Sequence, residues 1–139
     1  MRVLGLDVGG RWIGVAVSDP EGKVVQPLRM LDRREVERDP ANLRRLCEAM
    51  GVGGIVIGLP LRTDGKPSER AEEVRRFGEW LEGALGIPVR FFDERLTTKA
   101  AEAILRAEGR KVERERKEAV SASLILEGYL KLRRARESD

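Results

Sequence analysis

The chain has 139 residues, which is about the length of one domain, and it carries a net charge of +3 with a pI near 9.3. Hydrophobic residues make up 41% and charged residues 37%, a balance typical of a globular protein with a heavily charged surface. The chain has no histidine, which excludes Ser-His-Asp and Cys-His catalysis and histidine-ligated zinc. Carboxylates, lysine, hydroxyl groups or a metal must therefore carry any catalysis, and the slight excess of positive charge favours polyanionic partners.

The sequence predicts a cytoplasmic protein with no membrane segment. No apolar run approaches the roughly 20 residues of a membrane span, and the apolar stretch before Asp7 is too short for a signal peptide. The single cysteine, Cys47, cannot form an intramolecular disulfide, in agreement with a reducing compartment. It lies at helical spacing with Leu43 and Met50, so we expect a buried core thiol there rather than a nucleophile.

The first part of the chain predicts three consecutive strands. An apolar segment, Arg2–Asp7, runs into the Gly9-Gly10 turn, and apolar side chains then alternate over residues 12–17. A third strand is expected over Lys23–Arg29, after a turn rich in breaker residues. The connections are short, so we expect antiparallel hairpins.

Helices and strands are then predicted to alternate. In chain order these are a helix from Asp39-Pro40 to Met50, a strand Gly53–Leu59, a helix from Pro67-Ser68 to Leu85, a strand Ile87–Phe92, a helix capped by Thr97 or Thr98, and a last helix Glu118–Leu132 with a basic tail over 131–139. This order predicts a single α/β domain over residues 1–139. Its sheet would be mixed and five-stranded, with the first strand parallel to the two later ones, the hairpin strands outside and helices on its faces.

Two carboxylates are predicted at one edge of this sheet. Asp7 ends the first strand and Glu94 follows the last one, and the carboxyl ends of parallel strands meet at the same edge. Asp93 precedes Glu94 and would point to the other face, so Glu94 is the better candidate. Carboxylate oxygens suit Mg²⁺ as ligands. Two such metal ions at one site can activate a water molecule and stabilise the leaving oxygen of a displacement. Asp7 taken alone is also compatible with an ordinary turn aspartate.

A third carboxylate, Glu118, begins the last predicted helix and shares a face with Ala122 and Leu126. It is compatible with a metal ligand and with simple charge compensation at a helix N-terminus. The adjacent Lys117 is a candidate phosphate or transition-state contact.

Four segments resemble the pre-16S rRNA nuclease family, whose members are also described as Holliday-junction-resolvase-like (YqgF-type) proteins. The segments are LGLDVGGRWIGVAVSD, GLPLRTDGKPSERA, FFDERLTTKAAE and KEAVSASLILEGYL, and they extend from residue 4 to residue 130 in the family's order. The resemblance implies an RNase H-like fold and a nuclease that uses Mg²⁺ or Mn²⁺. Asp7 matches the family's first catalytic aspartate, and Glu94 matches the acidic residue of its DERLTT motif.

The chain departs from the family pattern at two places. The family's third acid is usually an aspartate, and the matching position here is Glu118, whose side chain is longer by one methylene. A basic pair is common after the first motif, whereas this chain has Arg11 and Trp12. Trp12 could stack on a base, but packing on the sheet is the better interpretation.

Basic side chains near the acids are candidates for nucleic-acid contacts. Arg62 and Lys66 lie in a loop that follows the Gly53–Leu59 strand, although Asp64-Gly65 would also make an ordinary surface turn. Arg95 and Lys99 flank the start of a predicted helix, where backbone N–H groups favour anions. The full set of candidates is Arg11, Arg62, Lys66, Arg95, Lys99 and Lys117.

The residues and the resemblance together predict a metal-dependent hydrolase of phosphodiester bonds that binds structured RNA or branched DNA. The resemblance implies trimming of the 5′ end of precursor 16S rRNA, with pre-ribosomal particles as partners and a monomer or weak homodimer. Three alternatives stay open: a Holliday-junction resolvase, which would need a symmetric dimer to cut two strands; a binding module without catalysis, suggested by Glu118; and an actin-like phosphotransferase, for which one domain is too short.

Overall fold

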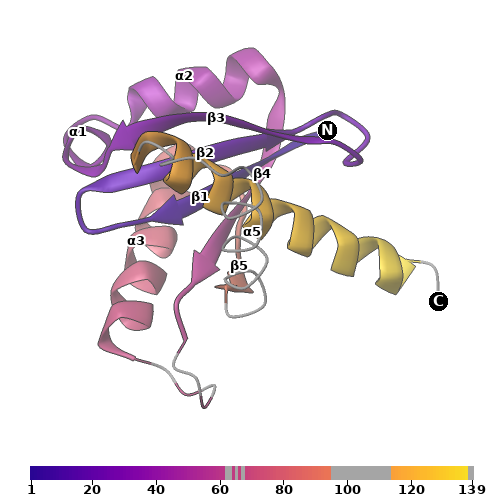
Figure 1. Cartoon of the computed structure of the whole chain (residues 1–139). Coiled ribbons are helices and arrows are strands. Elements are labelled where there is room, and N and C mark those ends of the chain that lie inside the picture. The colour runs from indigo at the N-terminus through magenta and orange to yellow at the C-terminus, as the bar shows by residue number, and fades with distance from the viewer. Residues whose placement is uncertain (62–63, 65, 67, 95–113, 138–139) are drawn as a thin grey trace.

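The computed structural model describes residues 1–61, 64, 66, 68–94 and 114–137, with the backbone alone for 114–118 and 137. It contains a five-stranded sheet with the strand order β3-β2-β1-β4-β5. Helices cover both faces of this sheet (Figure 1). The predicted mixed α/β fold is confirmed, and the predicted helix at Thr97 or Thr98 lies outside the described residues.

The three N-terminal strands are β1 (Arg2–Val8), β2 (Trp12–Ser18) and β3 (Val25–Asp32), joined as antiparallel neighbours as predicted. The prediction for β3 was wrong by two to three residues at each end. The carboxylate of Asp19 accepts hydrogen bonds from the backbone N–H groups of Lys23 and Val24, at 2.7 and 3.0 Å, which keeps these residues in the turn. At its other end β3 continues to Asp32, opposite Trp12.

The parallel part of the sheet consists of β1, β4 (Val52–Leu59) and the edge strand β5 (Val89–Asp93). The register pairs Leu6 with Ile57, and Leu59 with Asp93, so the carboxyl ends of these strands lie at one edge. The strand predicted over Ile87–Phe92 begins two residues later. Pro88 has no N–H to donate, and its carbonyl oxygen accepts a hydrogen bond from Ile55 at 2.9 Å.

Helices α1 (Arg33–Arg38), α2 (Ala41–Met50) and α3 (Glu69–Leu85) pack on one face of the sheet. Both predicted ends of α3 are confirmed: the Ser68 hydroxyl accepts a hydrogen bond from Ala71 N–H, and Gly86 follows the helix with a φ of 69°. Cys47 is fully buried in this layer, as predicted, and burial raises the pKa of its thiol to about 11.

Helix α1 was not predicted from the sequence. Asp32 caps it by accepting a hydrogen bond from Arg34 N–H at 2.9 Å, but Val36 is its only buried residue among those described. Six residues with a single apolar contact give no periodic pattern, so the cap was the one available signal.

Helix α5 (Arg114–Glu137) covers the opposite face of the sheet. Two expectations about it are corrected. The helix begins at Arg114 rather than at Glu118, and residues 131–137 continue the helix instead of forming a tail. The flanking Arg, Lys, Glu and Ala residues are strong helix formers with no Gly or Pro among them, and Arg134 donates a hydrogen bond to the Gly22 carbonyl at 2.6 Å. Within the described parts of the chain, no helix is both long and apolar enough to cross a membrane.

Candidate active site

Asp7 lies near the carboxyl end of β1, on the sheet face that α5 covers. Side chains alternate along a strand, and Val3 belongs to the core cluster under α5, whereas Leu4 and Leu6 belong to the cluster on the other face. Asp7 therefore shares the face of Val3 and Gly5, and it is partly buried. The predicted placement of Asp7 at this edge is confirmed.

Glu94 lies on the same face and at the same edge, directly after β5. A methyl group on Gly58 would lie 2.9 Å from the Glu94 Oε2 atom and 3.0 Å from Ile125 Cγ1 of α5. The Glu94 carboxylate therefore reaches over the bare backbone of β4, toward β1. Asp93 alternates with it and points to the opposite face, as expected.

The environment of Glu94 disfavours its ionised form. Burial raises the pKa of the Glu94 carboxyl, the positive charge of Arg70 opposes this effect, and the negative charge of Asp93 adds to it. A partly buried carboxyl with a raised pKa at a sheet edge is typical of functional sites, and a bound cation would restore its charge.

The third acid, Glu118, is placed by the path of α5. Ala122 and Leu126 approach Gly5, and Leu130 lies next to Gly22 at the opposite end of β1. The helix therefore runs from the edge of Asp7 toward the other edge, as Figure 1 shows. The backbone of Glu118 lies one turn before Ala122, on the Asp7 side. Since the helix begins at Arg114, Glu118 is in its second turn, which weakens the charge-compensation interpretation.

Two arginines that were not predicted from the sequence hold the turn after Asp7. Arg70 donates a hydrogen bond to the Val8 carbonyl at 3.1 Å, and Arg33 donates one to the Gly9 carbonyl at 3.0 Å. Arg33 also pairs with Glu73 at 3.0 Å. A cation in the first turn of a helix opposes the helix dipole, so Arg70 in α3 was a signal that the sequence did contain.

A backbone hydrogen bond within the protein makes the turn at Gly9-Gly10 tight. Gly9 N–H donates a hydrogen bond to the Trp12 carbonyl at 2.8 Å, and a methyl group on Gly9 would lie 2.8 Å from the same oxygen. Gly10 is exposed with open space around it, so only Gly9 is required by the turn. Arg11 is exposed at this edge, 5.0 Å from the centre of the Trp12 ring and 3.9 Å from the Asp32 carboxylate.

The other predicted nucleic-acid contacts are described only in part. Lys66 is exposed, and its backbone N–H donates a hydrogen bond to the Asp64 carboxylate at 3.0 Å, after the end of β4. Lys117 is placed by its backbone in the first turns of α5. Arg62, Arg95 and Lys99 lie outside the described residues, so their roles remain predictions.

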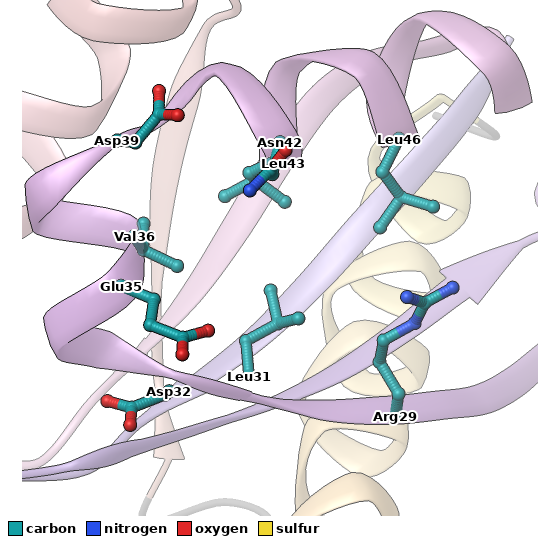
Figure 2. Close-up of a pocket in the computed structure, with 9 residues that line it drawn as sticks. All are labelled: Arg29, Leu31, Asp32, Glu35, Val36, Asp39, Asn42, Leu43 and Leu46. Carbon is teal, nitrogen blue, oxygen red and sulfur yellow. The ribbon is translucent and has the colours of Figure 1, made fainter.

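A separate hollow of about 100 Å³ lies between β3, α1 and α2, on the face away from α5 (Figure 2). Its floor is apolar, and two of its acids are committed to helix starts: Asp32 binds Arg34 N–H, and Asp39 binds Ala41 N–H at 3.1 Å. Neither Asp7 nor Glu94 lines it. We therefore interpret it as a packing gap between helices.

Comparison with known proteins identifies the family. The sequence model of a family described as "RuvX: Holliday junction resolvase" matches residues 1–132. The chain belongs to the RuvX family. A relative from Moorella thermoacetica, named "Putative pre-16S rRNA nuclease", is 46% identical over 94% of this RuvX-family chain and 94% of its own. One of the same name from Chloroflexus aurantiacus is 44% identical over 96% and 88%. The prediction of a nuclease, a hydrolase of phosphodiester bonds, is confirmed at the level of this family.

Solved structures confirm the RNase H-like fold of the RuvX-family protein. The complex of Thermus thermophilus RuvC with a Holliday junction substrate matches with a TM-score of 0.63 and 16% identity, over 97% of this chain and 96% of that one. The fowlpox virus Holliday junction resolvase matches with a TM-score of 0.55 and 11% identity, over 95% and 99%. Likeness at these identities concerns the fold alone.

Proposed function

We propose that this protein is a divalent-metal-dependent nuclease that trims the 5′ end of precursor 16S rRNA, with Asp7, Glu94 and Glu118 as its catalytic acids. The observation that carries the proposal is the placement of Asp7 and Glu94 on one face and one edge of the sheet, in a chain of the RuvX family. The backbone of Glu118 approaches that edge from α5.

The residues at this edge fit Mg²⁺ or Mn²⁺. Their donors are carboxylate oxygens, which hard divalent cations prefer, and burial raises the pKa of the Glu94 carboxyl against the opposing effect of Arg70. Among the described side chains, no group of three acids, histidines or cysteines is close enough to hold a metal. We propose Asp7 and Glu94 as two of the ligands and Glu118, described here by its backbone alone, as the third. A bound divalent ion would supply a nucleophilic water and stabilise the leaving oxygen.

The rest of the edge serves to position the substrate. Arg70 and Arg33 hold the carbonyls of Val8 and Gly9, so the turn after Asp7 is fixed before substrate binds. Gly58 has no side chain, which lets the Glu94 carboxylate and Ile125 of α5 pack directly over the backbone of β4 between the strands that carry the acids. Basic side chains around the edge would then contact the neighbouring phosphates; we propose Arg11, Arg62, Lys66, Arg95, Lys99 and Lys117.

The proposed substrate rests on the relatives, whose names specify pre-16S rRNA. It implies work in the cytoplasm on pre-ribosomal particles, by a monomer, because trimming one strand needs one active site. The family description specifies a Holliday junction resolvase, which requires a symmetric dimer to cut two strands.

The test compares precursor 16S rRNA with four-way DNA junctions, each in Mg²⁺ and in Mn²⁺. The wild type is expected to cleave the RNA, and Asp7→Asn and Glu94→Gln are each expected to lose on the order of a hundredfold or more in rate, because removal of one stabilising group from a preorganised site typically costs that much. Asp93→Asn is the matched control, since it removes a neighbouring acid that faces away from the site.

Three outcomes would contradict the proposal. Equal losses for Asp93→Asn and Glu94→Gln would remove Glu94 from the site, and undiminished cleavage by Asp7→Asn would remove Asp7. Cleavage of junctions by a stable dimer, with no action on precursor rRNA, would favour the resolvase. Sedimentation of the same preparation measures the oligomeric state.

A further inference from the structure

A second groove lies between the edge strand β5 and the last turns of α5. Its volume is about 630 Å³, and the residues that line it are Val89, Arg90, Phe91, Phe92, Tyr129, Leu132, Arg133 and Arg136. Three of these carry a guanidinium group and none is acidic. The groove is therefore positively charged over an apolar and aromatic floor.

One face of α5 forms one wall of this groove. Tyr129, Leu132, Arg133 and Arg136 follow the i, i+3, i+4, i+7 spacing, which places them on one side of a helix. Arg133 lies over the Tyr129 ring at 5.9 Å, so the aromatic ring and the charge form one surface. The helix extends beyond the sheet in this region (Figure 1), and Leu132 and Arg136 are exposed.

The opposite wall connects the groove to the acidic edge. Arg90 pairs with Val56, and Phe92 pairs with Gly58, so both point to the α5 face of β5. Glu94 follows β5 directly, and its carboxylate lies on the same face, beside Gly58. Along the strand, Arg90 lies about 10 Å before Asp93, the last residue of β5, which corresponds to about three nucleotides of a stacked nucleic-acid strand.

We propose that this groove binds the phosphodiester backbone of the strand that enters the acidic edge, with Arg90 and Arg136 as phosphate contacts. That the bound strand leads to the acidic edge rests on the proposed nuclease function. That the groove binds nucleic acid rests on its positive charge, which complements the phosphates. Arg90 and Arg136 are both exposed, and neither makes an ion pair with another described residue. Both guanidinium groups can therefore reach phosphates without breaking a contact of that kind.

The test measures binding of single-stranded RNA by fluorescence anisotropy in EDTA, where metal-dependent cleavage cannot proceed. The groove variant is Arg90→Gln/Arg136→Gln. The control is Arg34→Gln/Arg38→Gln, which removes the same charge from exposed positions of α1 on the other face. The probes are RNAs of about 16 and about 4 nucleotides, which bracket the usual site sizes of single-strand binders.

The groove variant loses two phosphate contacts, and each lowers the slope of log affinity against log salt concentration by about 0.7, or about 1.4 in all. Relative to 1 M salt, this corresponds to about 25-fold weaker binding of the longer RNA at 0.1 M salt. The control should bind the longer RNA with nearly wild-type affinity. For the short RNA, the groove substitutions should weaken binding by a smaller factor. Equal affinities of the groove variant and the control for the longer RNA would overturn the proposal. So would a loss of poly-glutamate binding without a loss of RNA binding, which would point to an acidic protein partner.

Failure of this proposal is distinguishable from failure of the proposed function. If the wild type cleaves RNA and the groove variant binds and cleaves like the control, the groove is refuted and the nuclease is not. If the wild type cleaves neither RNA nor DNA, a selective loss of RNA binding in the groove variant still supports the groove. Circular dichroism melting of each variant confirms that both are folded.

Discussion

At the scale of single residues, Gly58 connects the fold to the proposed chemistry. A methyl group there would meet both the Glu94 carboxylate and Ile125 of α5. The Gly58→Ala variant is expected to displace the carboxylate, and a misplacement of about 1 Å can cost about a hundredfold in rate. Its cleavage rate should therefore fall by roughly ten- to a hundredfold, measured under single-turnover conditions.

The matched control for Gly58 lies in the same strand. Gly54 has no atom within 4 Å of the position where a methyl group would be added. Gly54→Ala should therefore keep the wild-type rate. Equal rates for the two alanine variants would contradict the placement of Glu94 over Gly58.

Arg70 gives a prediction about pH. Its positive charge lowers the pKa of Glu94, against the raising effect of burial. Protonated Glu94 cannot serve as an anionic ligand, so activity should fall as the pH decreases through this pKa. Arg70→Gln should raise the pKa further and move the acid limb of the pH–rate profile to higher pH.

Arg70→Lys keeps the positive charge while it changes the geometry of the contact with Val8. We expect its acid limb to stay close to that of the wild type, even if its maximal rate is lower. An acid limb that moves equally in both variants would show that the contact of Arg70 with Val8, and not the charge of Arg70, controls the ionisation of Glu94.

At the scale of elements, the docking of α5 depends on Gly5. A methyl group on Gly5 would lie 2.8 Å from Leu126 Cβ and 2.9 Å from the Ala122 carbonyl oxygen, and neither atom is the end of a flexible side chain. Gly5→Ala should push α5 away from the sheet and lower the free energy of unfolding by about 1–3 kcal/mol, a usual cost of overpacking. Urea denaturation measures the change.

Gly83→Ala is the control of opposite sign. Gly83 lies inside α3 with open space around it, so alanine should raise the free energy of unfolding by about 0.5–1 kcal/mol through helix propensity. A Gly5→Ala variant as stable as the wild type would contradict the close approach of α5 to β1, because neither Gly5 nor Gly83 has a positive φ that would require glycine.

The elements that the sequence predicted well are those with long periodic patterns. The buried strand β4 and the capped helix α3 were found with nearly their observed bounds, because apolar spacing and caps are local signals. Helix α1 was missed since it has one buried residue, and the start of β3 was misplaced since a side-chain bond from Asp19 decides it. The early start of α5 comes from helix propensity without an apolar pattern.

At the scale of the whole molecule, the sequence could place Asp7 and Glu94 at one edge because strand order and alternation follow from pattern alone. It could not place Arg70 and Arg33 beside them. These residues are 62 and 24 positions away from the carbonyls that they bind, and nothing local specifies such contacts. The same holds for the groove, whose walls come from β5 and from the end of α5.

The whole chain should be stabilised by the divalent metal that we propose for its acidic edge. A ligand that binds only the folded state at a hundred times its Kd adds about 2.7 kcal/mol, which corresponds to a rise in Tm of roughly 10 °C for a chain of this size. We expect this rise with Mn²⁺ in the wild type and in Asp93→Asn, and its loss in Asp7→Asn and Glu94→Gln, as measured by differential scanning calorimetry. EDTA should reverse it. A rise of the same size in Asp7→Asn would place the ion elsewhere on the protein, because a site that lacks one of its anionic ligands cannot keep its full affinity.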